Sequence, residues 1–205
     1  MNKKFFSLLF FIVLSFSSFA GNEVGNGGGV LYHLESKTPV MFFDAYETEA
    51  RYGYRIQWPR DLSDEYKVAM SFTSRLAKYD PKLQKQLNGW IKSFYAEASF
   101  SQSDLPLIFD MGTGIHIPEW SGVAQLIIQT KHGYILNQRY WNKLSTEQKG
   151  VAILHEVVYR KALEVNPRLF LSEKVRIFVA ILISNELRFF TANGYQGLLQ
   201  HLELK

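Results

Sequence analysis

The amino-acid sequence predicts an α+β fold, mostly helical, with a small antiparallel sheet. Two segments towards the C-terminus, 146–165 and 173–190, are apolar on most faces, which is typical of central helices. Segment 122–130 is rich in Val and Ile, and the turn Lys131-His132-Gly133 separates it from segment 134–138. This pattern predicts a β-hairpin. The finer expectation is a zincin-like arrangement around the first long helix.

The first twenty residues have the features of a secretory signal peptide. Two lysines precede an apolar run, 5–16, which is too short to span a bilayer, and Ser18 and Ala20 put small residues at the −3 and −1 positions of a cleavage site. We therefore expect residues 1–20 to be removed and residues 30–205 to form one domain. No later segment is long enough to span a membrane. The sequence thus predicts export, to the periplasm or beyond.

Residues 21–29 are dominated by glycine and have almost nothing to bury. A flexible start to the mature chain is the first interpretation. The second is a glycine turn packed near the functional site, because glycine permits close backbone approach. A phosphate-binding loop is excluded, since no Gly-Lys-Ser/Thr follows.

Several elements are expected before the hairpin, in chain order a strand at 30–33, a short helix at 47–51, a helix at 63–79, a helix from 81, and extended pieces at 105–109 and 115–117. Ser63 and Asp80 are candidate N-caps, and Pro81 suits the first helical position. Further on, Ser145 and Gln148 fit a capping box that opens the helix 146–165. Ser172 is the expected cap of the last helix, which should stop at the Asn-Gly pair 193–194.

Composition excludes several classes of function. The formal net charge of +4 falls to +2 once the two leader lysines are removed, with 21 basic (23 − 2) against 19 acidic side chains. This is no basic footprint for nucleic acid. Cysteine is absent, which excludes disulfides and thiol nucleophiles. The core must therefore supply the stability, and an aromatic content of 15% suits that demand.

The helix 146–165 carries the sequence His155-Glu156-x-x-Tyr159-Arg160. It is similar to the zinc-protease motif His-Glu-x-x-His, in which two histidines one turn apart bind the metal and the glutamate activates a water. Tyr159 replaces the second histidine, and a neutral phenol is a poor zinc ligand. Glu186 is a candidate ligand on the next helix. One hypothesis is therefore zinc held by His155 and Glu186, with Glu156 as the catalytic base.

The second interpretation is a buried structural network. Glu156 and Arg160 are i,i+4 neighbours in the favourable order, acid first. Arg176 on the last helix is a candidate partner for Glu156 or Glu186. If Glu156 were the partner of a buried Arg160, Glu156→Ala would cost roughly 3–5 kcal/mol.

His155 would complete this network by a hydrogen bond to Tyr159 or Glu186. Under this interpretation the protein is non-catalytic or acts by binding, with no cofactor, and this is the function that we favour. The alternative is a zinc-dependent hydrolase or peptidase with an atypical site.

Other polar residues have no supporting pattern. Four histidines stand alone and are expected to be solvated or singly hydrogen-bonded, namely His33, His116, His132 and His201. Three acids flank the middle segment, Glu97, Asp104 and Asp110. No spacing rule identifies a glycosidase pair among them, so we expect surface acids.

Several short motifs are shared with known sequences, and they are Gly25–Gly28, Phe43–Glu47, Ile117-Pro118 with Gln125, Leu154–Glu156 with Tyr159-Arg160, and Ser172 with Val175-Arg176. On these motifs the chain resembles a family of uncharacterised exported proteins of Gram-negative bacteria. The resemblance implies that Tyr159 is the usual residue at its position. Family members often carry two cysteines that this chain lacks, which implies the loss of a disulfide as a pair. The resemblance brings no established activity.

Overall fold

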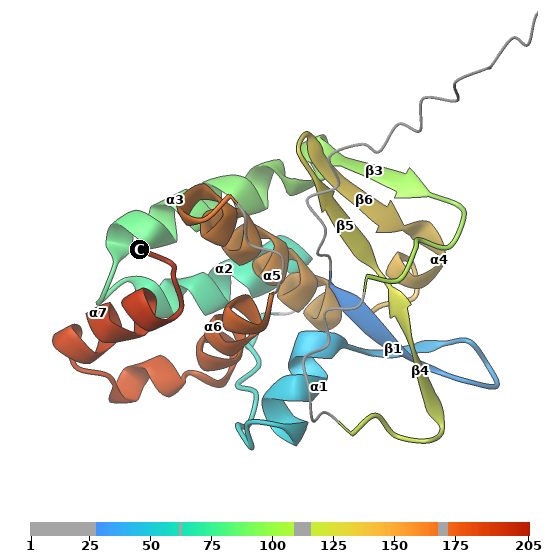
Figure 1. Ribbon diagram of the computed structural model, residues 1–205, viewed down its shortest axis with the longest axis horizontal. Helices are drawn as coiled ribbons and strands as arrows, with labels where there is room; N and C mark the ends of the chain where they lie inside the picture. Colours follow the sequence, from blue (N-terminus) through green and yellow to red (C-terminus); the bar gives the residue numbers. More distant parts are fainter. Residues whose placement is uncertain (1–27, 62, 109–115, 168–171) are drawn as a thin grey trace, which may run out of the picture.

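A computed structural model describes residues 28–61, 63–108, 116–167 and 172–205. It confirms the predicted α+β class, with most of the helices on one side of the molecule and two small sheets on the other (Figure 1). The predicted signal peptide lies outside the described residues. Within the described ranges, none of the helices is long and apolar enough to cross a membrane.

Each sheet has three strands. The first has the order β2-β1-β4 and is antiparallel throughout, with β1 Gly29–His33, β2 Pro39–Phe42 and β4 Ser121–Gln125. The second has the order β3-β6-β5, with β3 Ala98–Ser101 parallel to β6 Gly133–Asn137, and β5 Ile127–Thr130 antiparallel to it. The second sheet is therefore mixed, which the sequence did not predict.

The predicted hairpin is confirmed as β5 and β6, but its first strand is shorter than expected. Leu126 is fully buried and interrupts segment 122–130, so that β4 and β5 belong to different sheets. The backbone N–H of Leu126 donates to the carbonyl of Gly28, and its own carbonyl accepts from the N–H of Asn137. The chain thus crosses between the sheets at Leu126 and remains hydrogen-bonded to both sides.

The described helices are α1 Phe43–Ala50, α2 Glu65–Thr73, α3 Pro81–Ser93, α4 Gln138–Trp141, α5 Thr146–Val165, α6 Glu173–Ser184 and α7 Ala192–His201, with 3₁₀ turns at Ser74–Leu76, Phe94–Glu97 and Glu186–Phe189. The long helix α5 is central and contacts α1, α2, α3, α6 and β2 (Figure 1). Asp80 caps α3 as predicted, by accepting from the N–H of Leu83. Most of the hydrophobic core is built around α5 and α6.

The start of α5 is tied to the first sheet. Ser145 caps the helix as predicted, because its hydroxyl accepts from the N–H of Gln148. The Gln148 carboxamide does not complete a capping box, since its oxygen accepts at 2.7 Å from the N–H of Phe42. This bond fixes the junction between β2 and α1 against α5. At α2, Asp64 provides the cap in place of the predicted Ser63.

The predicted last helix is wrong in length. Helix α6 ends at Ser184 because Asn185 adopts the left-handed conformation, with φ at 63°, which terminates a helix. A 3₁₀ turn follows, and α7 was not predicted at all. The Asn-Gly pair 193–194, the predicted end of the last helix, lies in the first turn of α7, where the Gly194 N–H donates to the Thr191 hydroxyl.

Candidate functional site

The polar residues of the His-Glu-x-x-Tyr motif lie inside the molecule. His155 is 1% exposed, while Glu156 and Tyr159 are fully buried. All three belong to α5, the helix with packing neighbours on most of its faces. Because a buried polar group is costly unless it is hydrogen-bonded, the partners of these side chains decide what the motif does.

His155 is paired with Asp44. The Nδ1 atom of His155 lies 2.6 Å from Oδ2 of Asp44, and both side chains are about 1% exposed. Helix α1 begins at Phe43, four residues before its predicted start, and this places Asp44 in its first turn. The positive end of the helix dipole favours a carboxylate there.

Two aromatic rings complete the surroundings of His155. Phe42 meets the imidazole edge-on at 5.8 Å, and Tyr159 stacks on it at 6.2 Å with an interplanar angle of 13°. Tyr159 is thus a packing neighbour of His155, and the predicted hydrogen bond from His155 to Tyr159 or Glu186 is wrong. The second nitrogen, Nε2, is buried and has no hydrogen-bond partner among the described residues.

Glu156 is held by the backbone of the glycine-rich segment. Its Oε1 atom accepts from the N–H of Gly28 at 3.0 Å, while Oε2 is buried with no hydrogen-bond partner in the part of the chain that the structure describes. A Cβ atom on Gly28 would lie 2.2 Å from the Phe42 ring. At Gly28, therefore, the glycine turn is packed beside the site, whereas residues 21–27 lie outside the described residues.

The burial of Glu156 and His155 shifts the pKa values of both side chains. Burial raises the pKa of Glu156 to about 7, against the opposing effects of His155 and the Gly28 N–H. For His155, burial alone would lower the pKa. The charge and hydrogen bond of Asp44 outweigh burial, so the pKa of His155 is raised.

Arg160 has a different partner from the one predicted. It is one-third exposed, and its Nη1 atom lies 2.8 Å from Oε2 of Glu97. Its guanidinium stacks over the Trp90 ring at 4.7 Å. Because Glu156 uses Gly28 instead, the predicted Glu156–Arg160 pair is wrong.

A separate buried ion pair joins α6 to α1. The Nε atom of Arg176 donates to Oε2 of Glu47 at 2.7 Å, and its Nη1 donates to the Ser172 hydroxyl at 2.6 Å. Arg51 contacts the other oxygen of Glu47 at 2.7 Å. The predicted partners of Arg176, Glu156 and Glu186, are therefore wrong, and Ser172 serves Arg176 rather than the helix N-terminus.

The predicted zinc ligands, His155 and Glu186, do not form a metal-binding group with a third ligand among the described residues. Glu186 lies in the 3₁₀ turn beyond α6, because the helix ends at Asn185. In residues 28–61, 63–108, 116–167 and 172–205, no three His, Asp or Glu side chains form a group that could hold a metal ion. A structural or catalytic zinc site needs at least three protein ligands. The residues described thus do not supply a zinc site, and zinc binding stays a prediction.

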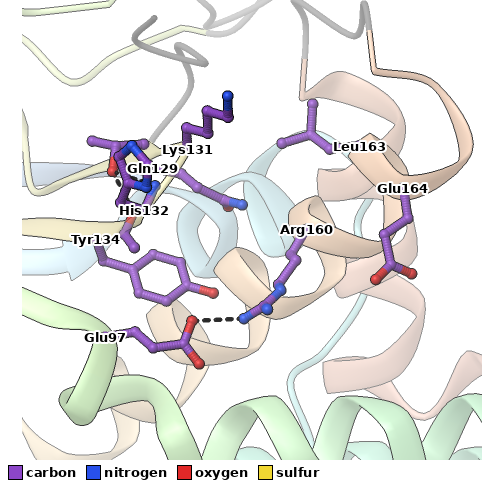
Figure 2. A pocket seen from close by; sticks show the side chains of 10 residues that line it. Glu97, Gln129, Lys131, His132, Tyr134, Arg160, Leu163 and Glu164 are labelled. Atoms are coloured by element: carbon purple, nitrogen blue, oxygen red, sulfur yellow. Dashed lines mark hydrogen bonds and ion pairs between the residues drawn. The ribbon is translucent and has the colours of Figure 1, made fainter. Parts of the chain in front are cut away.

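A cleft opens beside Arg160, with a volume of about 320 Å³ (Figure 2). Its lining comes from the 3₁₀ turn Phe94–Glu97, the β5–β6 hairpin and the second half of α5, namely Glu97, Gln129–Tyr134, Arg160, Leu163 and Glu164. Gln129 is 6% exposed, and its Oε1 atom is buried without a hydrogen-bond partner among the described residues. In Figure 2 its side chain extends between Tyr134 and Leu163 into this space.

Tyr134 is a buried residue of the cleft lining. It is 3% exposed, and its hydroxyl points towards the Arg160 guanidinium (Figure 2). Burial raises the pKa of Tyr134, and the nearby charge of Glu156 raises it further. The charges of Glu156 and Arg160 therefore both act on this phenol, in opposite directions.

The isolated histidines and acids have simple environments. His132 is exposed in the cleft wall, and His116 and His201 are also exposed. His33 stacks on Trp120 at 5.8 Å. Of the flanking acids, Asp104 is 66% exposed near Arg139, whereas Glu97 belongs to the cleft. Asp110 lies outside the described residues.

Three residues of the site were not predicted from the sequence, namely Asp44, Glu47 and Gln129. One signal was available for the first two, because both acids interrupt or border an apolar segment, 39–46. A carboxylate in such a segment needs a buried partner. Gln129 gave no signal, since an amide in a strand has no distinctive pattern.

No protein-family model, curated protein or solved structure matches the chain. Function has to be inferred from the geometry, and the resemblance to exported proteins of Gram-negative bacteria stays a prediction.

Proposed function

We propose that this protein is a non-catalytic binding domain in which buried polar pairs fix the fold and the cleft beside Arg160 receives a ligand. One observation carries the proposal. On α5 the side chains of His155 and Glu156 are enclosed in the core, whereas Arg160, one turn further on, lines an open cleft.

Enclosure argues against chemistry at the motif. A general base must lie within hydrogen-bond reach of the proton that it removes. Glu156 is fully buried and already accepts a backbone hydrogen bond, and His155 is 1% exposed and paired with Asp44. These contacts join α5 to Gly28 and to α1, which is a structural role.

The cleft has the dimensions of a ligand site. Its volume of about 320 Å³ lies at the lower end of the range of roughly 300–1,000 Å³ that is usual for small-molecule sites. Its walls come from a helix and a hairpin, which are rigid elements that position side chains better than loops do. The buried pairs around His155 and Glu156 fix the register of α5 and so the position of Arg160.

A ligand screen on the purified mature chain tests this proposal. We expect compounds that raise the melting temperature to shift the backbone amide resonances of Gly133 and Leu163, and Arg160→Ala to abolish the effect. Lys143→Ala is the matched control, because Lys143 is an exposed cation that does not line the cleft. Ligand-induced shifts that gather elsewhere, or hydrolysis of model peptides and esters by the purified protein, would overturn it.

A metal-dependent hydrolase is the second candidate. It is favoured by the Asp44–His155 arrangement, because a carboxylate on Nδ1 commonly orients an imidazole whose Nε2 binds a metal. Elemental analysis separates the two candidates. Stoichiometric zinc that is lost in His155→Ala and Glu186→Ala, with the fold retained by circular dichroism, would support the hydrolase. Metal-free protein after purification in zinc-containing buffer supports the binding domain.

The proposal also includes export, on the strength of residues 1–20. Expression of the full chain in a Gram-negative host should give a mature protein that begins at Gly21, as measured by mass spectrometry. Retention of the intact leader in the cytoplasmic fraction would contradict this part.

A further inference from the structure

The acids of the cleft are already engaged. Both carboxylate oxygens of Glu97 accept bonds, one from the Ser93 hydroxyl at 2.7 Å and one from Arg160 at 2.8 Å. Glu164 accepts from the Gln86 amide at 2.9 Å, and its Oε2 also lies 3.6 Å from Lys161. The carboxylates that line the cleft are therefore already hydrogen-bonded or ion-paired, Glu97 with Ser93 and Arg160, and Glu164 with Gln86 and Lys161.

The two cations of the cleft, Lys131 and Arg160, can still donate hydrogen bonds to a ligand. Lys131 is exposed at the hairpin turn and makes no ion pair with any residue that the structure describes. Arg160 uses Nη1 for Glu97, and its guanidinium lies over the Trp90 ring, 4.7 Å from the ring centre, so further N–H groups of its planar fork remain for a ligand. Lys131 and Arg160 lie on opposite walls of the cleft, one on the hairpin and one on α5 (Figure 2).

One acceptor inside the cleft also lacks a partner. Gln129 is more than nine-tenths buried, and its Oε1 atom makes no hydrogen bond within the described ranges. Leaving such a group unmatched is unfavourable. A hydroxyl or amino group of a ligand would satisfy it.

We infer that the cleft binds a small ligand through an anionic group, a carboxylate or a phosphate, that carries a hydroxyl or amino donor nearby. Lys131 supplies a positive charge that no described carboxylate compensates, the remaining N–H groups of Arg160 with Tyr134 and the Gln129 amide N–H supply hydrogen bonds, and Gln129 Oε1 accepts from the neighbouring donor. Arginine suits this task because its planar fork matches the geometry of carboxylate and phosphate oxygens. The inference rests on the proposed function, which makes this cleft the binding site.

Titrations of the mature protein followed by ¹H–¹⁵N NMR at constant ionic strength test it. The probes are inorganic phosphate, acetate, glycerol 3-phosphate, lactate and neutral glycerol. Saturable shifts at Gly133 and the Gln129 side-chain amide with an anion, but not with glycerol, are expected. Comparison of the phosphate probes with the carboxylate probes shows which anionic group the cleft prefers. Glycerol 3-phosphate should bind more tightly than phosphate, and lactate more tightly than acetate.

Two variants distinguish a specific binding site from non-specific electrostatic attraction of anions to the protein. Lys131→Gln should weaken binding roughly tenfold or more, as expected for the loss of one charged hydrogen-bond partner, while Lys143→Gln leaves it unchanged. Gln129→Met should remove the preference for the hydroxylated anion without lowering the melting temperature. A purely structural Gln129 would instead give a less stable protein with an unchanged preference.

The outcomes keep this inference distinct from the proposed function. Equal weakening by Lys131→Gln and Lys143→Gln would overturn the anion site. Neutral screening hits that shift Gly133, with no response to any anion, would also overturn it and leave the binding domain standing. Hydrolytic activity with no ligand in the cleft would overturn both.

Discussion

The Nδ1 atom of His155 lies 2.6 Å from Oδ2 of Asp44, a residue 111 positions earlier in the chain. The contact joins the first turn of α1 to the middle of α5, and both side chains are about 1% exposed. A charged pair at this depth has little water to screen it. The loss of one partner therefore leaves the other without compensation.

Asp44→Asn tests this pair without changing its shape. We expect a loss of roughly 3–5 kcal/mol in the free energy of unfolding, the usual consequence of removing one partner of a buried ion pair. The pKa of His155 should fall, because burial would act without the opposing carboxylate. Urea denaturation and an NMR titration of the imidazole measure the two effects.

Asp104→Asn is the control for that variant. Asp104 is 66% exposed and lies 3.8 Å from Arg139, and exposed pairs of this kind contribute at most about 1 kcal/mol. Equal urea midpoints for Asp44→Asn and Asp104→Asn would show that the His155–Asp44 contact contributes no more to stability than an exposed ion pair.

Much of the fold could be predicted from local signals. The caps at Asp80 and Ser145, the hairpin turn at Lys131-His132-Gly133 and the apolar faces of α5 and α6 are properties of short segments. The placement of a buried polar centre at His155 and Glu156 followed in the same way, since these residues interrupt an apolar helix.

The partners of that centre could not be predicted, for a physical reason. Local spacing favoured the i,i+4 pair Glu156–Arg160, but α5 turns Arg160 towards Glu97 and Glu156 towards Gly28. The contact Gly28–Glu156 spans 128 positions. Such pairs depend on tertiary packing, which a single sequence does not encode in any local pattern.

The stability of the protein should fall as the pH rises through the neutral range. Burial raises the pKa of Glu156 to about 7, compared with an ordinary value of about 4.3 in the unfolded chain. Between these values the folded state binds more protons than the unfolded state, so the free energy of unfolding decreases with pH, by up to roughly 3 kcal/mol. His155 acts in the same direction, because the stability that its raised pKa provides is present below about pH 6.5 and is lost at higher pH. Urea midpoints measured from pH 4.5 to 8 check the slope, and a midpoint that rises over this range would contradict it.

Glu156→Gln separates the two contributions. The carboxamide oxygen can still accept from the Gly28 N–H, while the titrating carboxyl is gone. We expect the loss of stability between about pH 4.5 and pH 7 to disappear and the part due to His155 to remain. At pH 8 the variant should be at least as stable as the wild type, because a buried charge has been removed.

Glu156→Ala is the matched comparison. It leaves the Gly28 N–H buried without its acceptor, and we expect a loss of about 1–3 kcal/mol. Arg160 keeps Glu97 as its partner, so the larger loss that the sequence suggested does not apply. A Glu156→Gln variant as unstable at pH 8 as Glu156→Ala would show that the carboxylate charge itself is needed.

The packed glycine next to this carboxylate gives the last prediction. A methyl group on Gly28 would lie 2.2 Å from the ring of the fully buried Phe42, while a methyl group on Gly89 in α3 would meet nothing within 4 Å. Gly28→Ala should therefore destabilise the fold by about 1–3 kcal/mol through overpacking, and Gly89→Ala should stabilise it by up to about 1 kcal/mol, because alanine is the better helix former. Thermal denaturation compares the two directly. If both variants shift the melting temperature in the same direction, Gly28 is not held against Phe42, and the hydrogen bond that positions Glu156 has no fixed donor.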